Sequence, residues 1–136
     1  MRISTFNTRM LMTFFAFSIF LSASAQTAAP LDVTVSTASN GSGTVNVICY
    51  VLLQDTTATS QIQVQLGSMS DSTDIANYSF VFDQTSGLPS GYSYIRNGNN
   101  LTLNVGTIAD VLTFFGRVRI KDSSGSWGDY FRFISN

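Results

Sequence analysis

The sequence has no histidine and no glutamate, so all eight of its acidic residues are aspartate. Without histidine, neither a Ser-His-Asp triad nor a Cys-His pair can be assembled. Without glutamate, a glycosidase-type carboxylate pair would require two aspartates, and the aspartates here lie mostly in segments typical of turns. The sequence therefore predicts no catalytic residues and no enzyme.

Cysteine and charge are also scarce. Cys49 is the only cysteine, so no disulfide can form within the chain. It lies in the apolar run VNVICYVLL (45–53), which predicts a buried thiol that acts as a small hydrophobe. Charged residues make up 11% of the chain and the formal net charge is −1, whereas a nucleic-acid-binding domain is usually strongly basic. We expect no nucleic-acid partner and no cofactor.

The first 25 residues have the three parts of a secretory signal peptide. Arg2 and Arg9 give a positively charged n-region, and residues 10–21 (MLMTFFAFSIFL) are almost wholly apolar. Residues 22–25 (SASA) are the small residues of a cleavage site. The apolar run is shorter than the roughly 20 residues of a membrane-spanning helix, and no second run follows it. We expect cleavage after Ala25 and an exported product, periplasmic, cell-surface or extracellular, without a membrane span.

Beyond a short flexible leader at 26–30, apolar and polar residues alternate with the period of two that is typical of strands. Val, Ile, Thr, Tyr and Phe are frequent, and strong helix formers are rare. Alternate residues from Val45 to Leu53 form one apolar face. Ile48, Tyr50 and Leu52 lie on the opposite face of the same segment, which predicts a central strand covered on both sides.

Turn-forming segments separate these predicted strands. Asn97-Gly98 between two alternating runs is a strong hairpin signal. A second hairpin is expected to join 114–122 to 129–135 across the turn at 123–126. About seven to eight strands with frequent turns predict one all-β domain over 31–136, an antiparallel two-sheet sandwich.

Two stretches resemble known β-sandwich modules. Residues 111–133 (VLTFFGRVRIKDSSGSWGDYFRF) resemble the last hairpin of fibronectin type III and related immunoglobulin-like domains: an aromatic residue, an alternating V-R-V run, a D-x-x-G turn and a closing strand. Residues 86–106 look like a hairpin of bacterial cadherin-like modules. Phe115 stands where those domains usually have a tyrosine, which removes the hydroxyl of a tyrosine corner. The resemblance implies an immunoglobulin-like sandwich that serves adhesion, display or binding.

Basic residues are concentrated in the last hairpin. Arg117, Arg119 and Lys121 should project from one face of a strand, and Arg132 from the matching face of the next strand. One interpretation is a surface that holds anionic sugars or an acidic partner. The other is a solvated face that protects an edge strand.

Aromatic residues and aspartates of the same region leave further alternatives open. Trp127 and Tyr130 either display their rings to a sugar or protein partner or fold back over the end of the sandwich. Residues 71–74 (DSTD), and Asp122 with Asp129, are candidate calcium ligands. Turn stabilisation by the aspartate side chains is the favoured interpretation, and no metal is predicted.

Taken together, these features favour a non-catalytic exported binding module. Our first hypothesis is an accessory or adaptor subunit that binds a protein partner at the cell envelope or cell surface. The alternatives are a carbohydrate-binding module that uses Trp127, Tyr130 and the basic residues, and a structural surface subunit that associates with itself.

Overall fold

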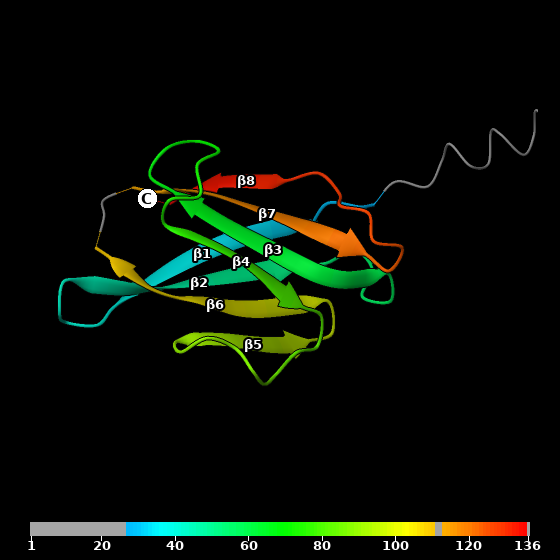
Figure 1. Ribbon diagram of the computed structural model, residues 1–136, viewed down its shortest axis with the longest axis horizontal. Coiled ribbons are helices and arrows are strands. Elements are labelled where there is room, and N and C mark those ends of the chain that lie inside the picture. The colour runs from blue at the N-terminus through cyan, green and yellow to red at the C-terminus, as the bar shows by residue number, and fades with distance from the viewer. Residues whose placement is uncertain (1–26, 111–112, 136) are drawn as a thin grey trace, which may run out of the picture.

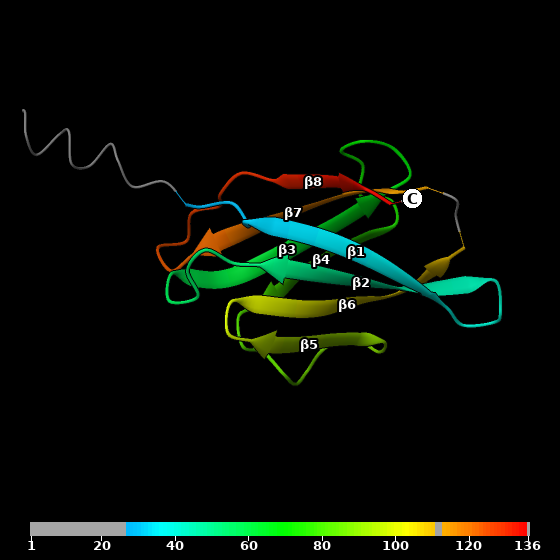
Figure 2. The same ribbon diagram turned by 180° about the vertical axis from the view of Figure 1, so that it is seen from behind.

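The computed structural model describes residues 27–110 and 113–135, so the predicted signal peptide lies outside the described residues. Its eight strands form two antiparallel sheets that are stacked face to face (Figures 1 and 2). The prediction of an all-β two-sheet sandwich is confirmed. The strands are β1 (Asp32–Ser39), β2 (Thr44–Leu52), β3 (Thr59–Gly67), β4 (Ala76–Val81), β5 (Tyr92–Asn97), β6 (Asn100–Ala109), β7 (Phe115–Asp122) and β8 (Phe131–Ile134).

The strand order is consistent with an immunoglobulin-like fold. One sheet has the order β1-β2-β6-β5 and the other the order β4-β3-β7-β8. In immunoglobulin lettering these orders correspond to A-B-E-D and to C-F-G with one additional strand beside C. Within the described residues, no helix is long and apolar enough to cross a membrane.

The core lies between the sheets and is built from the inward half of each alternating pattern. On β2 the predicted apolar face is confirmed, because every second residue from Val45 to Leu53 is buried. Tyr94 is buried as well, and its ring lies 6.3 Å from that of Phe80 on the facing sheet. Burial of a large apolar side chain contributes roughly 1.5–3 kcal/mol, so this face accounts for much of the stability of the fold.

The outer face of β2 differs from the prediction. Its central position is confirmed, since β2 lies between β1 and β6. The expected cover on both sides is wrong, because the side chain of Tyr50 on the outer face is 43% exposed. Its cross-strand neighbours are Thr34 and Thr102, and no further layer of described residues covers this sheet.

The residues before β1 lie against the loop between β7 and β8. The Thr27 hydroxyl donates hydrogen bonds to the Asp122 carboxylate and to the Ser126 carbonyl oxygen. The Gln54 side-chain amide donates to the Ala29 carbonyl oxygen at 3.0 Å. The Thr27 contacts join the beginning of the described chain to the last hairpin, and the Gln54 contact joins it to the loop between β2 and β3.

That hairpin contains a one-residue irregularity. Lys121 pairs with Trp127, and Val118 pairs with Phe131. The chain therefore advances three residues on β7 but four on the returning side, which is the geometry of a β-bulge. As a result, Trp127 shares the outer face with Lys121, whereas Phe131 packs against the core beside Val118.

Candidate binding face

All six residues predicted as binding residues lie in one region, the outer face of the β4-β3-β7-β8 sheet. Arg117, Arg119 and Lys121 alternate with buried residues along β7, and Arg132 on β8 is directly opposite Arg117. We call the four cations with Trp127 and Tyr130 the basic face. Because β7 lies between β3 and β8, the interpretation that the cations protect an edge strand is wrong for the three cations of β7, whereas Arg132 does lie on the edge strand β8.

The aromatic rings of the basic face pack against its cations. The guanidinium carbon of Arg119 lies 4.4 Å from the ring centre of Trp127 and 4.7 Å from that of Tyr130. Arg117 lies 4.3 Å from Tyr130, and the Lys121 ammonium lies 5.5 Å from Trp127. These distances fit cation–π contacts. Trp127 thus folds back over the face of the sheet rather than over its end.

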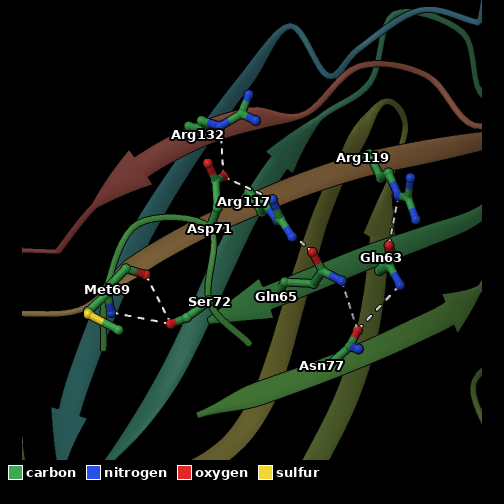
Figure 3. A network of polar contacts seen from close by, with 9 residues as sticks. All are labelled: Gln63, Gln65, Met69, Asp71, Ser72, Asn77, Arg117, Arg119 and Arg132. Carbon is green, nitrogen blue, oxygen red and sulfur yellow. Dashed lines mark hydrogen bonds and ion pairs between the residues drawn. The ribbon is translucent and has the colours of Figure 1, made fainter. Parts of the chain in front are cut away.

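Glutamine side chains of β3 hold the arginines from the other side (Figure 3). Arg119 Nε donates to Gln63 Oε1 at 2.7 Å, and Arg117 Nε donates to Gln65 Oε1 at 2.6 Å. Both glutamine amides donate to Asn77 Oδ1 on β4 at 3.3 Å. Gln65 is buried on this outer face, with 6% of its surface exposed.

Asp71, in the loop between β3 and β4, bridges two of the arginines (Figure 3). Its Oδ1 accepts hydrogen bonds from Arg117 Nη1 at 2.8 Å and from Arg132 Nε at 3.1 Å. The hydrogen bond from Arg132, with the charges of both arginines, lowers the pKa of Asp71 against the opposing effect of desolvation. This role was not apparent from the sequence, where Asp71 belongs to a turn-like segment 46 residues before Arg117.

A cavity of about 270 Å³ opens beside this ion pair, between the β3–β4 loop and the ends of β7 and β8. Phe115, Phe133 and Ile134 supply apolar surface, and Asp71, Arg117 and Arg132 supply charge. Ile134 is 57% exposed. The cavity thus places an apolar surface directly next to two guanidinium groups.

The basic face carries an excess of positive charge. Arg2 and Arg9 belong to the predicted signal peptide, and four of the remaining five basic residues lie here. Among the residues that the structure describes, Asp71 is the one carboxylate that forms an ion pair with them. The terminal nitrogens of Arg119 donate no hydrogen bond to any described residue. This arrangement suits the binding of an anion.

Other aspartates stabilise turns. The carboxylate of Asp74 accepts hydrogen bonds from the hydroxyl and backbone N–H of Ser68. That of Asp122 accepts from the hydroxyl of Ser124 and from backbone N–H groups. These bonds, led by the serine hydroxyls, hold the pKa of both carboxyls well below its usual range. The favoured turn role is confirmed for both residues, and no three potential metal ligands cluster within the described ranges.

Comparison with known proteins identifies no family. No protein-family model matches the chain, and no curated protein matches it. The assignment as a two-sheet β-sandwich with an immunoglobulin-like strand order therefore rests on the strand topology itself.

Proposed function

We propose that this chain is a non-catalytic exported binding module, an accessory or adaptor subunit whose basic face holds an acidic segment of a partner protein at the cell envelope or cell surface. The observation that carries the proposal is the gathering of four cations on one sheet face, with Asp71 as the carboxylate that pairs with them. The immunoglobulin-like strand order agrees with this role, although a fold alone does not determine function.

The geometry of the arginines supports carboxylate binding. A guanidinium that stacks on a ring still has its N–H donors in its own plane, where they reach a carboxylate. Arg119 is held by Gln63 on one side and by two rings on the other. Such a group is already ordered, so binding a partner requires little further loss of side-chain entropy.

The packing of the rings argues against the carbohydrate alternative in its simplest form. A sugar that stacks on an aromatic side chain needs an open ring face. Here Arg119 lies against both Trp127 and Tyr130, and each ring has a second cation within 6 Å. The aromatic side chains therefore position the cations rather than forming an open platform.

The proposal is tested by measuring the affinity of the purified protein for a fluorescently labelled oligoglutamate. Arg119→Gln should lower the affinity about tenfold, the loss expected when a charge-assisted hydrogen bond of about 1.5 kcal/mol is removed. Arg96→Gln is the matched control, because Arg96 lies on β5 of the other sheet and pairs with Asp83. Equal affinities for all three proteins would overturn the proposal.

Two further measurements separate the alternatives. Preference for sulfated dextran over oligoglutamate, with the same loss in Arg119→Gln, would replace the protein partner by an anionic polysaccharide. Sedimentation of the protein without any ligand tests self-association. Oligomers that grow with protein concentration would favour the structural surface subunit instead.

A further inference from the structure

Asp71 occupies the position that a partner's carboxylate would take on the basic face. Arg117 and Arg132 are directly opposite in the register of β7 and β8, where like charges repel. The carboxylate of Asp71 contacts both guanidinium groups. It comes from a loop, outside the two strands that carry the arginines.

The contact of Asp71 is weak and separable from the fold of its loop. The side chains of Asp71 and Arg132 are 52% and 56% exposed, and exposed ion pairs contribute little to stability. The loop has its own internal hydrogen bonds, from Ser72 to the Met69 carbonyl oxygen and from Ser68 to Asp74 (Figure 3 shows the first). The loop therefore keeps these bonds when Asp71 leaves the arginines.

The neighbouring cavity indicates which kind of side chain would lie beside the carboxylate of a bound partner segment. Its volume of about 270 Å³ is just below the roughly 300–1,000 Å³ of small-molecule sites, a size that suits an apolar side chain. Phe115 and Ile134 provide the apolar contact next to Arg117. A carboxylate with an apolar residue beside it would satisfy both halves of the site.

We infer that Asp71 is an internal competitor for the ligand of this site. A partner segment with an acidic residue next to an apolar one displaces Asp71 from Arg117 and Arg132, and its apolar side chain enters the cavity. This inference rests on the proposed function of the basic face, and it adds the kind of sequence that the face selects and the group that limits access to it.

The test compares Asp71→Asn with Asp83→Asn. Both aspartates have a positive φ, 62° and 61°, which asparagine also tolerates, and both pair with arginine while half exposed. The probe is a labelled peptide, Gly-Ser-Asp-Leu-Asp-Gly-Ser, with a second peptide in which serine replaces leucine. Asp71→Asn should bind the leucine peptide at least about fivefold more tightly than the unaltered protein, because the competing charge is gone. Asp83→Asn should bind it as the unaltered protein does.

The outcomes distinguish this inference from the proposed function. Equal gains in both variants would reflect net charge alone and would overturn the inference, as would equal binding of the two peptides by Asp71→Asn. If Asp71→Asn gains nothing while Arg119→Gln still loses affinity for oligoglutamate, the inference fails and the proposed function stands. If Asp71→Asn and the unaltered protein bind neither the peptides nor oligoglutamate, both fail.

Discussion

Arg117 shows how completely a surface arginine can be ordered by its neighbours. Its Nε donates to Gln65, its Nη1 donates to Asp71, and its guanidinium lies over Tyr130. Fixing such a long side chain costs up to about 2 kcal/mol of rotamer entropy. In this protein that cost is met on folding. A lysine at the same position would keep the charge but would lose the planar set of donors.

Cys49 illustrates the opposite case, a reactive group made inert by its position. It is fully buried on the inner face of β2, and burial raises the pKa of its thiol to about 12. Since the thiolate is the reactive form, the folded protein should not react with a disulfide reagent at about pH 8. In denaturant, one thiol per chain should react at once. Fast reaction of the folded protein would contradict the described burial.

At the scale of elements, the β7–β8 pair depends on the absence of a side chain. Gly116 on β7 is opposite Phe133 on β8, and the Phe133 ring occupies the space where a Cβ would lie. A methyl group at Gly116 would come within 2.1 Å of Phe133 Cζ. Gly116 therefore lets β8 place an aromatic ring against the core.

Gly116→Ala should accordingly lower the free energy of unfolding by about 1–3 kcal/mol, the usual effect of overpacking a core. Urea denaturation provides the measurement. Combining Gly116→Ala with Phe133→Leu should restore part of the loss, because the two residues share one space and their effects are coupled. Simple addition of the two single effects would argue against the clash.

The strands and their inward and outward faces could be predicted from the sequence more readily than the pairing of one strand with another. Alternation identified the buried side of β2 and the outward cations of β7, because period two is a local property. It did not show that β3 lies beside β7, so the pairing of Gln63 with Arg119, 56 residues later, was not foreseen. The exposure of Tyr50 was missed for a related reason: alternation shows which side a residue faces, but not whether another layer covers that side.

Two other features of the basic face, the outward placement of its aromatic rings and the contact with Asp71, depend on the path of the backbone at single residues. One extra residue after Trp127 decides which aromatic residues of the last hairpin face outward. The contact of Asp71 with Arg117 requires a loop that returns over β7. Neither leaves a pattern in the local sequence, so the cations and the two aromatic residues were identified, but not Gln63, Gln65 and Asp71, which hold the arginines by hydrogen bonds.

The stability of the whole molecule should decline in acid. In the folded protein, hydrogen bonds led by those from Ser68 and Ser124 keep the pKa of Asp74 and Asp122 well below its usual range. In the unfolded chain the pKa of each aspartate returns to about 3.9. A lowered pKa in the folded state gives stability that is complete above the unfolded value and is lost as the pH falls below it.

Thermal unfolding followed between about pH 6 and pH 2 should therefore show a constant Tm at first and a decline that begins near pH 4. Asp74→Asn together with Asp122→Asn should start from a lower Tm and decline less steeply. A Tm that stays constant throughout this range would contradict the assigned hydrogen bonds.

The concentration of basic residues on one of the two sheets also affects how the domain is oriented as it diffuses toward a partner. Beyond residue 25 the chain has more aspartates than basic residues, yet its cations are concentrated on the β7 side, while the opposite face presents Tyr50 and Ile95. Four cations on one sheet face give that face a local positive potential. Near an acidic surface the domain would rotate to bring β7 forward before it arrives, and the rate of productive encounter would fall as salt shortens the Debye length below about 10 Å.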